Sequence, residues 1–181
     1  MDNNAIASAS SKLELLTIAL HECSLARDKD EDPFSYPRDL SQQSMLRVKL
    51  EKLNYESGDE SIDILRCYVS LVVRAGKATP KVKKEAAKDK SPSVEVYYTV
   101  EATYRVDYQI TGILTKEEAE EFSNFNSVHN VWPFWRFHVF ETLRSAELPP
   151  LRIPLMRGLN VKNVKKELKR KIEGKRKISM G

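Results

Sequence analysis

The side chains that most often do chemistry are few and widely spaced in this sequence. Its three histidines are His21, His129 and His138, and its two cysteines, Cys23 and Cys67, do not form a CxxC pair. Metal sites and thiol chemistry need such residues at tight spacings. The sequence also lacks a glycine-rich phosphate loop and any grouping of carboxylates, or of serine, histidine and aspartate, typical of catalysis. We therefore predict no catalytic residues, no metal and no other cofactor.

The residue types that favour binding are concentrated in one stretch, NVWPFWRF at 130–137, where four aromatic rings surround a proline. Proline costs least in the first turn of a helix, where the backbone N–H groups have no partner within the helix. Pro133 is therefore expected to begin a helix that ends near Ala146. Trp132 and Phe134, on either side of this break, are predicted to line the edge of a groove.

Two apolar stripes run along the expected helix. Trp135 lies on one of them, together with aliphatic residues one and two turns later, and Phe137 and Phe140 lie on the other. One sheet face covers only one stripe, and each large ring left in water forgoes about 1.5–3 kcal/mol of burial. We therefore expect Trp135, Phe137 and Phe140 to lie in the core or in an interface with another subunit.

Strands are predicted from the alternation of apolar and polar residues. The predicted strands are residues 13–25, 45–57, 62–76 and 94–110. The first also fits a helix, and we favour a strand. Turn residues at 57–61 predict a hairpin between the second and third strands. Thr115 and Glu118 have the spacing of a capping box for a short helix at 116–122. Strands followed by helices, without alternation, predict an α+β fold with helices on one face of an antiparallel sheet.

The remaining segments differ in composition. Residues 27–43 contain acids and two prolines and are predicted to form a crossover loop. Residues 77–93 are rich in lysine and are expected to form a flexible loop. Residues 160–181 contain nine lysines and arginines and two glutamates, a net charge of +7, whereas the whole chain carries +4. We expect one domain over 1–158 and a basic tail over 159–181, whose apolar spacing suits a helix.

The overall composition, 41% hydrophobic and 31% charged, is typical of a folded protein in water. No apolar run approaches the roughly 20 residues of a membrane span. The first ten residues lack the basic and apolar blocks of a secretory signal. These features predict a cytoplasmic protein without a membrane span.

Two short motifs together resemble the SecB-type export chaperones. NVWPFWR at 130–136 is similar to that family's aromatic-Pro-aromatic-x-Arg helix entrance, and LPPLRIP at 148–154 is similar to its later Pro-x-Leu-x-Leu-x-Pro segment. The expected order of elements is also similar: four strands with a crossover loop after the first, then a helix and an extended proline segment. The resemblance covers about residues 11–158.

The resemblance implies an ATP-independent holdase chaperone whose protomer is a four-stranded antiparallel Greek-key sheet packed on a long helix. Two dimers would form a tetramer with the helices between eight-stranded sheets. Unfolded polypeptides would bind in long apolar grooves between sheet, helix and crossover loop. The matching positions here are Phe34 and Tyr36 in the loop and Trp132 and Phe134 at the helix entrance.

The sequence also departs from the family pattern. Phe137 stands where the family usually has a glutamate, and no glycine occurs at 145–147. The family's translocase partner SecA is recognised through an acidic surface and a distinctive tail, so a tail of charge +7 argues against delivery to SecA. Two kinds of client stay open: exported proteins, and the antitoxin of a toxin–antitoxin pair for a solitary SecB-like chaperone.

The main alternative is a nucleic-acid-binding protein that acts through the basic tail, because clustered lysine and arginine attract phosphates without sequence preference. A sheet that stacks bases needs aromatic side chains on its solvated face, and Tyr97 is the chief one expected there. The tail is equally explained as an aid to solubility or docking. A third interpretation is a sheet-and-helix cup for one small apolar ligand.

Overall fold

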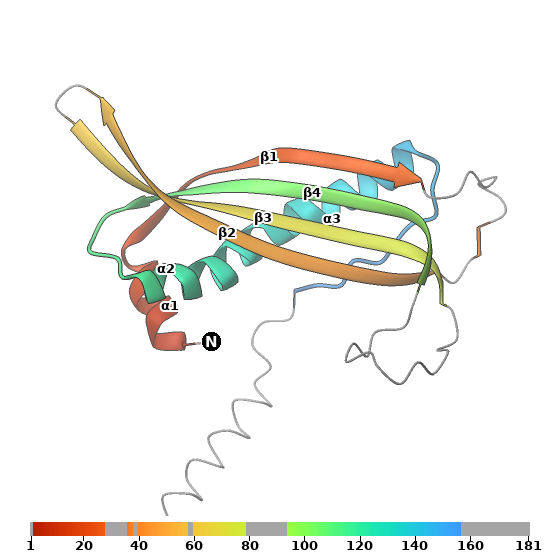
Figure 1. The fold of residues 1–181 in the computed structure, drawn as a ribbon, viewed down its shortest axis with the longest axis horizontal. Coiled ribbons are helices and arrows are strands. Elements are labelled where there is room, and N and C mark those ends of the chain that lie inside the picture. Colours follow the sequence, from red (N-terminus) through yellow and green to blue (C-terminus); the bar gives the residue numbers. More distant parts are fainter. Residues whose placement is uncertain (1, 28–35, 38–39, 58–59, 79–93, 157–181) are drawn as a thin grey trace, which may run out of the picture.

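The computed structural model describes residues 2–27, 36–37, 40–57, 60–78 and 94–156, which form one sheet with helices on one of its faces (Figure 1). The elements in chain order are α1 (Asn3–Ser10), β1 (Leu13–Arg27), β2 (Ser41–Ser57), β3 (Glu60–Ala78), β4 (Val94–Ile110), α2 (Lys116–Phe122), the π-helix η1 (Ser123–Ser127) and α3 (Val128–Ser145). The predicted α+β class is confirmed. No helix in the described ranges is long and apolar enough to cross a membrane.

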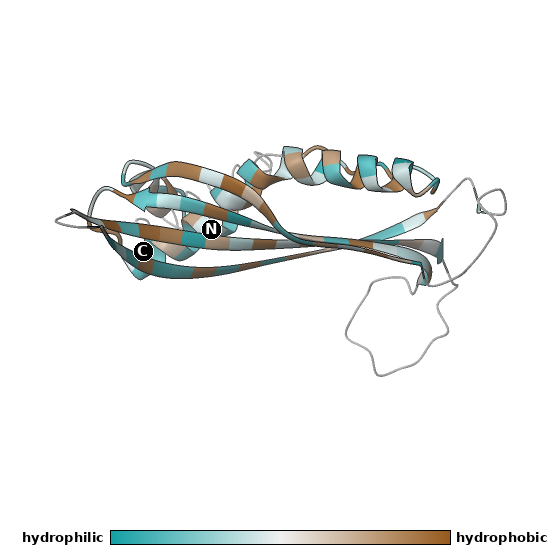
Figure 2. Ribbon diagram, turned by 90° about the horizontal axis from the view of Figure 1, so that it is seen from above, coloured by the Kyte–Doolittle hydropathy of each residue, from teal (hydrophilic) through white to brown (hydrophobic). Residues whose placement is uncertain are grey.

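The four strands are antiparallel and lie in the order β1-β4-β3-β2. Strands β2, β3 and β4 are neighbours in both sequence and space, and β1 lies beside β4, so the topology is a Greek key. All four predicted strands are confirmed, as is the hairpin, in which β2 and β3 pair from Ser41 and Gly76 to Ser57 and Glu60. Figure 2 shows the sheet as one layer with α3 above one face.

Two predicted loops are shorter than expected. The crossover connection was predicted to extend to residue 43, but Ser41 and the next two residues already pair with β3, because proline and acidic residues stop before them. The lysine-rich loop begins only after Ala78. Most of both loops, including Phe34, and the basic tail lie outside the described residues, so their structure and the predicted domain division stay predictions.

The helix-facing side of the sheet holds the core. Alternate residues of β3 and β4 on this side are at most 4% exposed. They are Leu65, Cys67, Val69, Leu71, Val73 and Ala75 of β3, and Tyr98, Val100, Ala102, Tyr104, Val106 and Tyr108 of β4. On the same side, Leu20 of β1 pairs with Tyr104, and Leu46 of β2 pairs with Leu71, yet both leucines are about half exposed. The helix layer thus covers the two central strands and leaves the edge strands partly open.

The opposite face of the sheet is less solvated than the alternation predicts. Asp107 is buried there because the guanidinium of Arg66, its partner across β3 and β4, donates two hydrogen bonds to its carboxylate, from Nε at 2.7 Å and Nη2 at 2.9 Å. The hydrogen bond to Asp107 raises the pKa of Arg66 above its usual value. Such a bidentate ion pair satisfies two charges, each of which would be costly to bury alone.

Tyr97 does not occupy the solvated position predicted for it. Ala75 pairs with Tyr98 and Gly76 pairs with Val96, so Tyr97 is the extra residue of a β-bulge. The bulge breaks the strict alternation of sides, and Tyr97 is buried beside Tyr36. The prediction that Tyr97 is an exposed aromatic on the solvated face is therefore wrong.

The prediction that Pro133 begins the long helix is also wrong. Elements α2, η1 and α3 follow one another without a break, and Pro133 lies inside α3, which begins at Val128. The polar stretch at 123–127 continues the helix, and three of its side chains bond to carbonyl oxygens four residues earlier. Ser123 Oγ donates to Ala119, Asn124 Nδ2 to Glu120, and Ser127 Oγ to Ser123.

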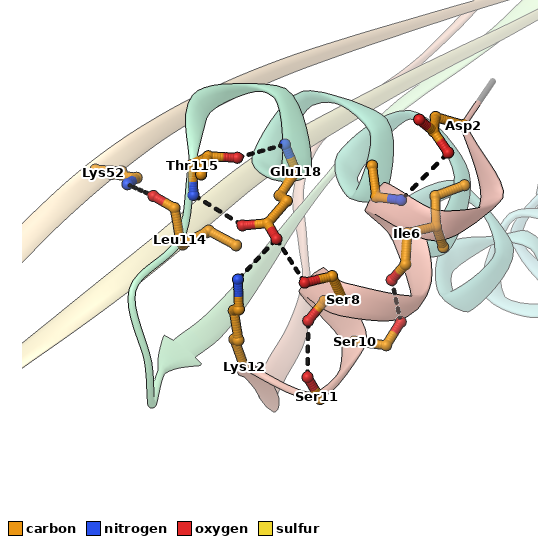
Figure 3. A network of polar contacts seen from close by, with 11 residues as sticks. Asp2, Ile6, Ser8, Ser10, Ser11, Lys12, Lys52, Leu114, Thr115 and Glu118 are labelled. Atoms are coloured by element: carbon orange, nitrogen blue, oxygen red, sulfur yellow. Dashed lines mark hydrogen bonds and ion pairs between the residues drawn. The ribbon is translucent and has the colours of Figure 1, made fainter.

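A carboxylate at the start of α2 ties the N-terminal helix to the rest of the protein (Figure 3). The predicted capping box is confirmed: Glu118 Oε2 accepts from the Thr115 amide at 2.9 Å, and Thr115 Oγ1 accepts from the Glu118 amide at 3.2 Å. The other carboxylate oxygen of Glu118, Oε1, accepts from Lys12 Nζ at 2.7 Å and from Ser8 Oγ at 2.6 Å. This connection holds α1, an element that the sequence did not predict, against α2.

These contacts predict a pH dependence of stability. The hydrogen bond from Lys12, then those from Ser8 and Thr115, lower the pKa of Glu118 from 4.5 to about 2. A lowered carboxylate pKa stabilises the fold above pH 4.5, and the contribution is lost as the pH falls from there to about 2. Glu118→Gln should therefore lower the urea midpoint at pH 7 and flatten its decline between pH 4.5 and 2.

The control for this prediction is Glu117→Gln, which removes the same charge from an exposed neighbouring position in the first turn of α2. Its urea midpoint should follow the wild-type pH profile. If Glu118→Gln also follows that profile, the carboxylate does not hold α1 in place.

Candidate functional site

A groove of about 770 Å³ lies between the end of the crossover connection and the segment that follows α3. One wall comes from residues just before β2 and from its first two residues. The other comes from the extended chain after α3. The lining residues are Tyr36, Pro37, Leu40, Ser41, Gln42, Pro149, Pro150, Leu151 and Arg152. Three of the nine are prolines and two are leucines, and Ser41, Gln42 and Arg152 add polar groups, so the lining is mixed.

The wall after α3 is itself an extended segment held by its backbone carbonyls. Leu148 and Ile153 anchor it in the core. Side chains from three elements donate to it: Tyr98 Oη to Pro149 O at 2.8 Å, Gln42 Nε2 to Arg152 O at 3.1 Å, Arg136 Nε to Ile153 O at 3.3 Å, and Trp132 Nε1 to Pro154 O at 2.9 Å. All four bonds recognise carbonyl oxygens, which every residue has, so they hold the segment independently of its side chains.

Tyr36 lies in the opposite wall. It is 7% exposed, and its ring centroid is 5.8 Å from that of Tyr97 and 6.1 Å from that of Tyr98. Burial raises the pKa of Tyr98, whose hydroxyl is nonetheless satisfied by Pro149. The Tyr36 hydroxyl is buried and has no hydrogen-bond partner among the residues that the structure describes.

The outer face of α3 carries a row of exposed aromatic rings. Phe134, Phe137 and Phe140 are 50%, 66% and 56% exposed, whereas Trp135 is 2% exposed and packs in the core. One of the two predicted stripes is therefore covered by the sheet. The other has no cover among the described residues of this chain. This outer stripe of α3 is therefore an exposed apolar surface.

The predicted binding residues do not all come together. Tyr36 lines the groove, and Trp132 is partly buried against the extended segment through its indole N–H. Phe134 is two positions after Trp132, so its side chain leaves the helix on the opposite side. These two rings were predicted to lie at one edge of the groove because a break in the helix was expected between them.

Several residues that hold the extended segment were missed. Tyr98 was counted only within a predicted strand, Gln42 within the crossover loop, and Arg136 within the NVWPFWR motif. In the structure all three donate to the extended segment. The signal that could have found them is the LPPLRIP stretch, since its three prolines disfavour regular secondary structure and leave backbone carbonyls to accept from side chains.

The titratable groups near the groove do not form a reactive cluster. Burial lowers the pKa of His138, whose ring stacks on Trp135 with centroids 6.2 Å apart. The ring therefore has a packing role. Within the described ranges no group of three or more histidine, cysteine, aspartate or glutamate side chains is placed to hold a metal.

Comparison with known proteins identifies the fold. No protein-family model matches the sequence, and no curated protein matches it either. The fold class is that of a SecB-like chaperone. Among solved structures, the SecB-like chaperone Rv1957 of Mycobacterium tuberculosis, determined in complex with a ChAD peptide from the antitoxin HigA1, superposes with a TM-score of 0.64. The match covers 87% of this chain and 99% of that one at 13% sequence identity. The likeness therefore lies in the fold, and the sequences have diverged widely.

Proposed function

We propose that this protein is an ATP-independent holdase chaperone that binds non-native polypeptides in the groove and on the exposed apolar stripe of α3. The observation that carries the proposal is the row of three exposed phenylalanines on α3, together with the groove of about 770 Å³. Exposed apolar patches of this kind mark interaction sites rather than stable free surface. The SecB-like fold supports the same function, and its solved representative binds an antitoxin peptide.

The client class and location are part of the proposal. An antitoxin or another chain that folds slowly would present the extended apolar segments that the groove suits. Export clients and a cytoplasmic location remain predictions from the sequence. Nucleic-acid binding rests on the composition of the tail alone. The burial of Tyr97 removes the aromatic residue that a base-stacking sheet would have used.

We further propose that the protein assembles, as a dimer of dimers, through Phe137 and Phe140, which leaves Phe134 to clients. A second copy of the chain would supply the cover that the outer stripe of α3 lacks. Burying Phe137 and Phe140 in this way contributes about 1.5–3 kcal/mol for each ring. Clients would then use the groove and the parts of the apolar surface that assembly leaves open.

The test of chaperone function is suppression of aggregation without ATP. A chemically denatured protein diluted into buffer should stay soluble when this protein is present in similar amounts. Combining Trp132→Ala and Phe134→Ala should require roughly 100-fold more chaperone for the same effect, since each change removes apolar contact worth about 1.5 kcal/mol or more when buried and about 1.4 kcal/mol is a factor of ten. The oligomer should keep its mass.

The control is Lys116→Ala, which truncates an exposed residue of α2 remote from the groove and should leave suppression unchanged. Loss of assembly with unchanged suppression in the double variant would contradict the assignment of these two rings. No suppression by the wild-type protein would refute the proposed function.

A further inference from the structure

The extended segment after α3, residues 148–156, is held in the way that a bound peptide is held. It belongs to no helix or strand. A strand of the sheet is held by the backbone groups of its neighbour. Here four carbonyl oxygens of the segment accept instead from side chains of β2, β4 and α3. The segment thus occupies its place through contacts that a separate polypeptide could also make.

The end of this segment, residues 153–156, lies against α3 and is here called the strap. Arg136 donates to Ile153 O, and Trp132, one turn earlier in the helix, donates to Pro154 O, so the strap runs antiparallel to α3. Ile153 is 8% exposed and packs in the core. Among the described residues, the attachment of the strap therefore consists mainly of one buried side chain, one partly buried side chain and these two hydrogen bonds.

So few contacts can break while the sheet stays folded, because segments with few buried contacts open locally at a cost far below that of global unfolding. Opening the strap frees the indole N–H of Trp132 and the guanidinium of Arg136, and it uncovers the apolar seat of Ile153. Two donors for carbonyl oxygens and an apolar seat can hold any extended chain with an apolar side chain at that place. Since Pro154 follows Ile153, the next residue needs no backbone N–H.

We propose that the strap is autoinhibitory: in the free protein it occupies a binding site on α3 for an extended client segment, and a client binds there by displacing it. The inference rests on the proposed chaperone function and adds how client binding is regulated. The ligand is an extended segment with an aliphatic side chain in the place of Ile153. Trp132, predicted to contact clients, donates to its own chain until the strap opens. The apparent affinity for a client is then reduced to the fraction of molecules whose strap is open.

The variant that tests this is Ile153→Ala in the full-length protein, which weakens the strap and leaves Trp132 and Arg136 in place. Binding is measured by fluorescence anisotropy with a labelled, reduced and carboxymethylated polypeptide that stays unfolded without denaturant. Because truncating this buried side chain raises the fraction of open strap, Ile153→Ala should tighten binding about 10-fold while it lowers the urea midpoint. A residue with only a structural role would lower the midpoint without tightening binding.

Two controls separate opening of the strap from general loosening of the fold. Leu65→Ala truncates a fully buried residue of β3 that lies ten residues before Ala75, the partner of Gln42. It should lower the urea midpoint without tightening binding. Leu155→Ala truncates a strap residue that is 71% exposed and should change neither quantity. Unchanged or weaker binding by Ile153→Ala would overturn the inference. So would equal tightening by Leu65→Ala, since the gain would then come from loosening anywhere in the core.

These outcomes also separate the two proposals. If neither the wild-type protein nor Ile153→Ala binds the unfolded polypeptide, the chaperone function fails. If the wild type binds it and Ile153→Ala binds no more tightly, only the autoinhibitory role of the strap fails.

Discussion

Replacing Phe137 and Phe140 with aspartate is expected to turn the assembled protein into monomers. Both rings are more than half exposed on the outer face of α3, where we propose that a second copy packs. An aspartate in that interface would be buried without a counter-ion, which is far more costly than losing the apolar contact. Light scattering after size exclusion should show the mass of one chain, 20.8 kDa, for the double variant. The wild type should have a multiple of that mass.

The matched control keeps these positions apolar. Phe137→Leu with Phe140→Leu should preserve assembly, and circular dichroism should show that both double variants stay folded. A wild-type protein that is monomeric at micromolar concentration would contradict the proposed assembly. So would an aspartate variant that keeps the wild-type mass.

Trp135→Ala is expected to have the largest effect on folding. This ring is 2% exposed, belongs to the buried stripe of α3 and stacks on His138. Truncating a large buried aromatic residue to alanine leaves a cavity and typically costs about 3–5 kcal/mol. Such a loss is a large part of the 5–15 kcal/mol that stabilises a typical domain. Urea unfolding followed by circular dichroism should show the fall in the free energy of unfolding.

The control for this variant is Arg144→Ala on the same helix. The Arg144 side chain is 72% exposed and, among the described residues, pairs only with Glu141 at 3.7 Å, so its loss should change stability by about 0.5 kcal/mol or less. If the two variants lose similar amounts, α3 does not pack on the sheet through Trp135.

Three of the strands were predictable because each has a long, regular alternation, whereas residues 13–25 fitted a helix as well. Residues 94–110 show this alternation throughout, and the strand occupies the same range. Helix α1 was not predicted, because asparagine, serine and alanine over eight residues give little apolar periodicity. Its place is fixed by distant contacts, chiefly those of Glu118 with Lys12 and Ser8. Likewise residues 123–127 continue the helix while their serine and asparagine side chains bond to its carbonyls, an arrangement that composition alone does not reveal.

The candidate site was predictable only in part. Aromatic content pointed to α3 and correctly separated Trp135 from Phe137 and Phe140. The groove itself combines residues from the crossover connection, β2 and the segment after α3, which are brought together only by the sheet order. The burial of Tyr36, and the lack of a partner for its hydroxyl among the described residues, depend on the side chains that surround it in the fold. No sequence pattern could indicate them.

The π-helix between α2 and α3 has a consequence for which rings face outward. Each residue of an α-helix advances by about 100°, and a π-turn takes up one residue more than an α-turn does. If Ser123–Ser127 were ordinary α-helix with the same number of residues, α3 would be rotated by roughly that angle relative to α2. Trp135 would turn away from the sheet. The length of η1 therefore sets how α3 is rotated about its axis. That rotation decides which rings pack on the sheet and which stay exposed for contact with other chains.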